Sequence, residues 1–94
     1  EIDEKIKIKV TEPDMYRVIF LNDNATPMDF VIEILVSIFR HSNDTAKDIT
    51  VEVHEQGASV VGTYTFEIAE QKAVEATTMS RSHGFPLQIK VEKE

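Results

Sequence analysis

The sequence predicts an α+β fold, a small β-α-α-β-α-β sandwich in which a three-stranded antiparallel sheet packs against three helices. Short stretches with strand-like alternation of apolar and polar residues are separated along the chain, and longer stretches with helical spacing lie between them. The chain has 94 residues, of which 41% are hydrophobic, and this suits one domain with a modest core. The predicted strands cover 16–21, 59–64 and 87–92, and the predicted helices cover 28–39, 44–56 and 65–82.

The first strand has two faces, because successive side chains of a strand point to opposite sides. One face carries Tyr16, Val18 and Phe20, and the other carries Arg17, Ile19 and Leu21. The strand stops at Asn22-Asp23-Asn24, and a helix opens at Thr26-Pro27. Thr26 is expected to cap that helix, with Asp29 completing a capping box, and Pro27 suits its first turn. As far as Phe39 the polar residues form one narrow stripe, so we expect this helix to be central and mostly buried.

Residues 44–56 fit both a strand and a helix. The alternating residues are Ile49, Val51 and Val53, and the residues on one helical face are Ala46, Ile49, Thr50, Val53 and His54. Ser42-Asn43-Asp44 in front is typical of a helix cap, and Gly57 behind is typical of a helix stop. We therefore predict a helix.

A short strand interrupted by Gly62 precedes the third helix, which starts near Thr65. Glu67 and Glu70 are favourably placed near the positive end of this helix. Its small residues share one face and would allow close packing: Ala69, Ala73, Ala76 and Ser80. His83-Gly84 ends the helix, and Pro86 leads into the last strand, where Leu87, Ile89 and Val91 alternate with polar residues.

We expect residues 14–94 to form the core domain and residues 1–13 to be a partly flexible N-terminal extension. The extension is dense in charge, although Ile6, Ile8 and Val10 alternate with lysines as in a strand. The chain begins with Glu1 rather than Met, so we expect a trimmed or processed product, and a removed leader stays an open alternative.

Composition narrows the classes of partner. The sequence has no cysteine, which leaves neither disulfides nor thiolate metal sites. The net charge of −7 disfavours nucleic acids and anionic membrane surfaces, since binding to either requires a basic face. No run approaches the roughly 18 apolar residues of a membrane span. A protein partner with a basic or mixed surface fits better.

Two features are candidates for chemistry, Asn22-Asp23-Asn24 and His54. Their ordinary explanations are a polar turn and a solvated or packed helix residue. His54 has no second histidine at metalloprotease spacing, and the three histidines of the chain form no zinc pattern, so we predict no metal and no cofactor. No serine lies in a Gly-x-Ser-x-Gly motif. The remaining enzyme alternative is a small acid/base enzyme that uses Asp23 and His54.

The apolar start of the first helix suggests a binding pocket instead. Met28, Val31 and Ile32 follow the polar loop closely, and most such residues belong to the core. Some of them could line a cavity beside Asn22 and Asp23, since binding pockets combine an apolar wall with a few fixed polar groups.

The sequence resembles the ClpS adaptor family over roughly residues 12–92. The matching runs are Tyr16 to Asp23, Thr26 to Val31, Val53-His54 with Gly57, Gly62 to Thr65, Glu67 to Lys72, and Phe85-Pro86-Leu87. The run Asn-Asp-x-x-Thr-Pro-Met is the most distinctive of them.

The resemblance implies an adaptor without enzymatic activity. It implies binding of proteins whose first residue is a bulky hydrophobic (Phe, Tyr, Trp or Leu) and their delivery to a AAA+ unfoldase of the ClpA or ClpC kind, in the N-degron pathway. It also implies a monomer in the bacterial cytoplasm, or in an organelle stroma if a leader was removed. A ClpS-like N-degron-binding domain of a ubiquitin ligase is the alternative in the same broad class.

The resemblance also implies roles for individual residues. The α-amine of the substrate would be bound by Asn22, Asp23 and His54, and the loop that supports this site would include Asn24, Thr26 and Pro27. The hydrophobic pocket would be formed by Met28, Val31, Thr50, Val53 and Leu87. Glu67 and Lys72 would contact the unfoldase. The chain departs from the usual family pattern at Asn24, where Asp is common, at Ala25, where a larger residue is frequent, and at Thr50, where Met is frequent.

Overall fold

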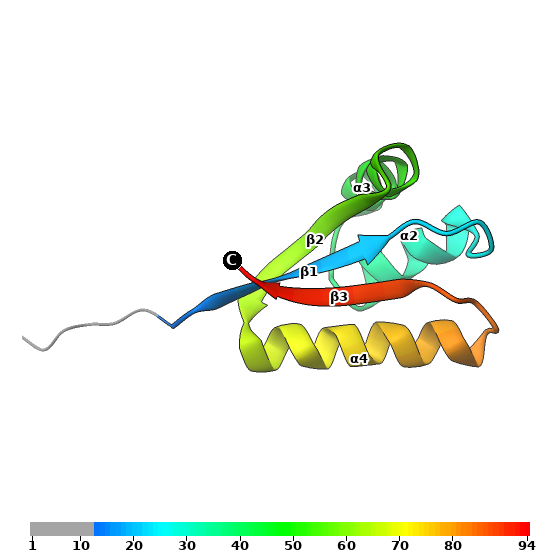
Figure 1. Ribbon diagram of the computed structural model, residues 1–94. Coiled ribbons are helices and arrows are strands. Elements are labelled where there is room, and N and C mark those ends of the chain that lie inside the picture. Colours follow the sequence, from blue (N-terminus) through cyan, green and yellow to red (C-terminus); the bar gives the residue numbers. More distant parts are fainter. Residues whose placement is uncertain (1–12) are drawn as a thin grey trace, which may run out of the picture.

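The structure, a computed structural model, describes residues 13–94 and has the predicted order of elements (Figure 1). Its strands are β1 (Met15–Leu21), β2 (Ala58–Thr65) and β3 (Gln88–Lys93), and its helices are α2 (Met28–Ser37), α3 (Asn43–Gln56) and α4 (Phe66–Ser82). The α+β prediction is thereby confirmed, including the helix at the ambiguous residues 44–56. The extension predicted over residues 1–13 lies outside the described residues, apart from Pro13.

The sheet is antiparallel with strand order β2-β1-β3, so β1 is the central strand. The interruption predicted at Gly62 corresponds to a register shift in the β1–β2 pair beside this residue. Leu21, the last residue of β1, lies opposite Ala58, the first residue of β2. Because α3 leads directly into β2, this register brings the loop after β1 next to the end of α3.

The core lies between one face of the sheet and the three helices. Val18 and Phe20 of β1 are completely buried, and α4 contacts all three strands. The buried helix residues are Phe30, Val31, Ile34 and Leu35 of α2, Ala46, Thr50 and Val53 of α3, and Ala69, Ala73, Ala76 and Ser80 of α4. The small-residue face predicted for α4 is therefore confirmed.

The predicted helix ends are right for α3 and wrong for α2. Ser42 caps α3 by accepting a hydrogen bond from the backbone N–H of Thr45 at 3.1 Å, and Gly57 ends it with a left-handed φ of 88°. In α2 the N-cap residue is Pro27, and no side chain caps the helix. The cap predicted for Thr26 is absent because its hydroxyl donates to Asp23 instead. This helix also ends at Ser37, before the predicted Phe39.

Among the helices of residues 13–94, none combines the length and the apolar composition that a bilayer crossing needs. The same residues contain no group of three or more His, Asp or Glu side chains that could hold a metal ion.

Candidate functional site

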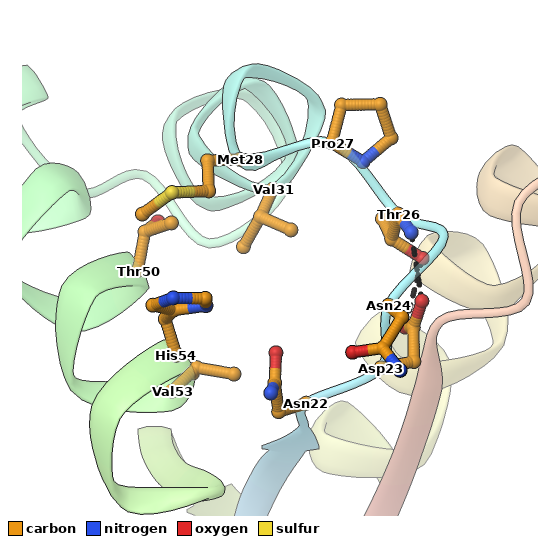
Figure 2. A pocket seen from close by; sticks show the side chains of 10 residues that line it. All are labelled: Asn22, Asp23, Asn24, Thr26, Pro27, Met28, Val31, Thr50, Val53 and His54. Carbon is orange, nitrogen blue, oxygen red and sulfur yellow. Dashed lines mark hydrogen bonds between the residues drawn. The ribbon is translucent and has the colours of Figure 1, made fainter.

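A cavity of about 300 Å³ lies where the end of β1, the start of α2 and the last turns of α3 meet (Figure 2). Ten residues line it: Asn22, Asp23, Asn24, Thr26, Pro27, Met28, Val31, Thr50, Val53 and His54. Every residue that the sequence assigned to the amine site, the supporting loop and the pocket is among them, except Leu87. The structure thus brings together groups that are up to 32 positions apart in the chain, from Asn22 to His54.

Asn22 and His54 are held across the cavity by the backbone. The N–H of Asn22 donates to the carbonyl of Gly57 at 2.9 Å, and the N–H of Gly57 donates to Val53 at 3.0 Å. This chain of hydrogen bonds joins the end of β1 to the last turn of α3, which carries His54. Figure 2 shows the Asn22 amide pointing into the cavity and the His54 ring on the facing helix.

The side chains of Asn22 and His54 make no hydrogen bond to any other group within residues 13–94. Both residues are solvent-exposed, so water can satisfy these groups in the free protein, and a ligand at the mouth of the apolar cavity can replace it. An amide oxygen and a neutral imidazole nitrogen are both hydrogen-bond acceptors.

The carboxylate of Asp23, in contrast, is engaged inside its own loop. Its Oδ1 atom accepts hydrogen bonds from the backbone N–H groups of Ala25 and Thr26, both at 2.7 Å. Its Oδ2 atom accepts from the Thr26 hydroxyl at 2.8 Å. Aspartate often stabilises turns in this way.

These contacts also explain the electrostatics of Asp23. Burial acts to raise the pKa of its carboxyl group, but the hydrogen bonds from Ala25 and Thr26 and the positive charge of Arg81 outweigh burial. The pKa of Asp23 therefore lies below its ordinary value of 3.8, and the group is ionised at neutral pH.

The apolar wall comes from α2 and α3. Val31 and Val53 are buried, whereas Met28 is 42% exposed and lies at the rim. The Thr50 hydroxyl donates to the backbone carbonyl of Ala46 at 2.7 Å, as threonines inside helices often do. Since the hydroxyl is satisfied within its own helix, Thr50 adds a short side chain to the wall and brings no unpaired polar group into the cavity.

Leu87 does not line this cavity. Its side chain is 1% exposed and belongs to the hydrophobic core, and the residue lies just before β3. The guanidinium Nη1 of Arg81 donates to the carbonyls of Leu87 at 2.8 Å and Phe85 at 3.1 Å, and so fixes the segment between α4 and β3. Sequence reasoning missed Arg81, although a basic residue in the last turn of a helix often binds nearby carbonyls.

Glu67 and Lys72, the residues predicted to contact an unfoldase, both lie on α4 but in different surroundings. Glu67 is exposed and borders a shallow surface hollow with Glu70, Gln71, Val74 and Glu75. Lys72 is partly buried, and its ammonium group donates to the carbonyl of Ile38 at 2.9 Å. It also lies 5.9 Å and 5.5 Å from the ring centroids of Phe39 and Tyr64. Lys72 therefore joins α4 to the end of α2.

The chain is similar to known proteins in sequence and in fold. The family model described as "ATP-dependent Clp protease adaptor protein ClpS" matches residues 11–90. The ClpS adapter protein of Treponema denticola is 47% identical over 88 residues, which cover 94% of this chain and 87% of that protein. That of Caulobacter vibrioides strain NA1000 is 41% identical over 90 residues, which cover 96% of this chain and 83% of that protein.

A solved structure is also similar. It is Agrobacterium tumefaciens ClpS2 bound to L-phenylalaninamide, which matches with a TM-score of 0.86 and 41% sequence identity. The match covers 88% of this chain and 100% of that one. With a family match over most of its length, relatives above 40% identity and the same fold, the chain belongs to the ClpS family of ATP-dependent Clp protease adaptor proteins.

Proposed function

We propose that this adaptor binds substrates through a free N-terminal amine and a bulky hydrophobic first side chain, Phe, Tyr, Trp or Leu. The observation that carries the proposal is the cavity, where two unengaged polar side chains, Asn22 and His54, adjoin an apolar wall. L-phenylalaninamide, the ligand in the structure of ClpS2, supports it. That molecule has a free α-amine, a benzyl side chain and an amide, which are the parts of a peptide's first residue.

The amine would be recognised by convergent acceptors. An α-amino group is a cation with three donors and a reference pKa of about 7.7–8.0, so it is charged at neutral pH. The Asn22 amide oxygen and a ring nitrogen of neutral His54 can each accept one of its hydrogen bonds, and Asn22 can also donate to the first peptide carbonyl. Hydrogen bonds to a charged group are stronger than those between neutral groups.

The first side chain would occupy the apolar part of the cavity, against Val31, Val53 and Thr50, with Met28 at the rim. A volume of about 300 Å³ is at the lower end of the range of about 300–1,000 Å³ for small-molecule pockets. It suits one side chain rather than an extended peptide segment. Specificity would thus rest on the first residue and its amine.

Delivery to a AAA+ unfoldase of the ClpA or ClpC kind is the second part of the proposal. The exposed face of α4 fits a docking role, because Val74 is 58% exposed and borders a shallow surface hollow with Glu67, Glu70, Gln71 and Glu75. Such a mixed acidic and apolar face suits the N-terminal domain of the unfoldase as a partner. We propose that the adaptor acts as a monomer in the bacterial cytoplasm.

We propose no enzymatic activity for this chain. The acid/base alternative would require Asp23 to exchange a proton, whereas its carboxylate accepts three hydrogen bonds and has a lowered pKa. The relatives reported above are Clp protease adaptors, which favours an adaptor over the ubiquitin-ligase alternative.

A titration with a Phe-initiated peptide and its N-acetylated twin tests the proposal. We expect the free-amine peptide to bind with a dissociation constant of about 1 μM or below, which corresponds to about −8 kcal/mol or better. The acetylated twin should bind at least tenfold more weakly, and mass spectrometry should find both peptides intact after overnight incubation. Equal affinity for the twins would refute amine recognition, and cleavage would refute the assignment as a pure adaptor.

A further inference from the structure

The contacts of Asp23 indicate a more specific role for this residue in substrate binding. The inference about this role rests on the proposed function. We propose that Asp23 is a positioning residue: its carboxylate holds the loop 23–26 in shape so that Asn22 and His54 meet the substrate amine. The carboxylate itself does not bind the amine. This differs from the sequence-based expectation, which placed Asp23 beside Asn22 and His54 as a third amine ligand.

The contacts of the carboxylate carry the inference. Oδ1 accepts from two consecutive backbone N–H groups, those of Ala25 and Thr26, and Oδ2 accepts from the Thr26 hydroxyl. Figure 2 shows the bonds between Asp23 and Thr26. The two N–H bonds are 2.7 Å long, which is shorter than the usual value of about 2.9–3.0 Å, and the hydroxyl bond of 2.8 Å has an ordinary length. These bonds occupy three of the roughly four acceptor positions of the carboxylate. Rotating the group toward a ligand would lengthen or break bonds that a charged acceptor makes strong.

The place of these bonds in the fold shows what they position. Thr26 immediately precedes Pro27, the first flanking residue of α2, and α2 carries Met28 and Val31 into the cavity. On its other side Asp23 follows Asn22, whose backbone is tied to Gly57. The Asp23 carboxylate therefore fixes the distance between the polar end of the cavity and its apolar wall.

The surrounding charge points the same way. The positive charge of Arg81 acts on Asp23, together with the two N–H groups and the hydroxyl that face the carboxylate. A carboxylate that is already compensated inside the protein attracts an external ammonium group less. The side chains of Asn22 and His54, by contrast, have no hydrogen-bond partner within the described residues.

Two substitutions separate positioning from direct contact. In Asp23→Asn the amide oxygen can still accept from Ala25 and Thr26, and its NH₂ group can donate to the Thr26 hydroxyl oxygen. Asp23→Ala removes all three bonds. With L-phenylalaninamide as the probe, we expect Asp23→Asn to bind within about threefold of the native protein and Asp23→Ala to bind at least tenfold more weakly, with folding checked by circular dichroism.

The other outcomes are equally informative. If Asp23→Asn is as weak as Asp23→Ala, the charge itself contacts the amine and the inference is wrong. If Asp23→Ala binds like the native protein, the loop needs no such support and the inference is also wrong. If the native protein fails to bind L-phenylalaninamide, the proposed function fails, and this result is distinct from the first two.

Nuclear magnetic resonance supplies a second readout, which a change in overall stability would not imitate. Amide protons that donate to a carboxylate resonate downfield. We expect the Ala25 and Thr26 signals of the native protein to keep their downfield positions when L-phenylalaninamide saturates the site. A large upfield shift of both signals would show that the carboxylate leaves the loop for the ligand, and would overturn the inference.

Discussion

The backbone N–H of Asn22 donates a hydrogen bond to the carbonyl of Gly57 at 2.9 Å, and this bond joins the end of β1 to the end of α3. Gly57 can occupy this place because it adopts a left-handed φ of 88°, which returns the chain from the helix into β2. The geometry of the cavity therefore depends on how α3 ends. Asn22 lies on one side of Gly57, and His54, three residues before Gly57, lies on the other.

Gly57→Ala should lower both stability and affinity. A side chain at Gly57 would meet no atom within 4 Å, so the cost comes from the left-handed backbone alone. We expect a loss of about 1 kcal/mol in the free energy of unfolding, measured with urea. Gly84→Ala is a matched control, since Gly84 has a φ of 80°, open space around it and no place in the cavity lining. Both variants should lose similar stability, but only Gly57→Ala should weaken binding of a Phe-initiated peptide. If Gly57→Ala and the native protein bind the peptide with equal affinity, the end of α3 does not determine the geometry of the binding site.

Asp23 should contribute to the pH dependence of stability. Its pKa in the folded protein lies below the ordinary value of 3.8, so between these two values the unfolded chain binds more protons than the folded one. Stability then rises with pH in this window. The contribution is fully present above the unfolded pKa and is lost as the pH falls through the folded pKa.

Unfolding of the native protein and of Asp23→Asn at a series of acidic pH values measures this contribution. The difference in unfolding free energy between the two proteins should shrink as the pH falls below the ordinary value for Asp. A difference that stays constant over the whole acidic range would contradict the lowered pKa.

His54 should contribute to the affinity for the substrate amine, because a ring nitrogen of its neutral imidazole can accept a hydrogen bond. His54→Ala should bind a Phe-initiated peptide at least tenfold more weakly than the native protein, because a hydrogen bond to a charged group contributes about 1.5–3 kcal/mol. A titration of both proteins with the same peptide measures this difference. Equal affinities of the two proteins would exclude His54 as the acceptor.

Much of the fold and most of the site could be predicted because local patterns coincide with tertiary contacts. The small face of α4 determines which of its residues are buried, and Ser42 and Gly57 mark the ends of α3 correctly. The alternation in 16–21 predicts the strand but not its burial, since Val18, Ile19 and Phe20 are all buried. The polar run at Asn22 and the apolar start of α2 are close in sequence, so their meeting at one cavity follows from a short loop.

The sequence does not reveal which of two competing partners a side chain binds, and the predicted Thr26 cap is wrong for this reason. Thr26 fits the pattern of a helix cap, but the carboxylate three residues earlier binds its hydroxyl, and no periodicity reveals this choice. Lys72 is a charged helix residue by sequence, yet it reaches Ile38, 34 positions away, a contact that only the packing of α4 on α2 creates. Leu87 lies just before β3 and is buried in the core, and its apolar character in the sequence does not indicate whether it also borders the cavity.

Glu67 and Lys72 should therefore respond differently to substitution. Glu67→Lys reverses an exposed charge, so we expect at least threefold weaker binding to the unfoldase N-terminal domain, with unchanged peptide affinity and stability. Glu33→Lys makes the same charge change on the exposed side of α2 and should leave unfoldase binding unaltered.

Lys72→Met should instead destabilise the domain by about 1–2 kcal/mol, because the Ile38 carbonyl loses its donor and the aromatic rings lose a cation. Calorimetric unfolding measures this loss. If Lys72→Met is as stable as the native protein but docks poorly, Lys72 belongs to the unfoldase interface after all.

Thr50 should determine how the pocket treats branched first residues. The hydroxyl of Thr50 is bound to Ala46, so the residue acts in the wall mainly through its small size. Met, the frequent residue of the family here, is longer and would fill space near the β and γ carbons of the ligand side chain. The native pocket should therefore admit Ile or Val beside Phe and Leu, and Thr50→Met should reject the β-branched residues. A misfit of one methylene in an apolar pocket costs about 1–3 kcal/mol, so the ratio of Ile to Phe affinity should change about tenfold.

Thr50→Val is the matched control, since it removes the hydroxyl, keeps the branched shape and should preserve the native ratio. Competition among Phe-, Leu-, Ile- and Val-initiated peptides gives these ratios. If Thr50→Met and the native protein rank the peptides alike with equal ratios, the wall at Thr50 does not contact the first side chain.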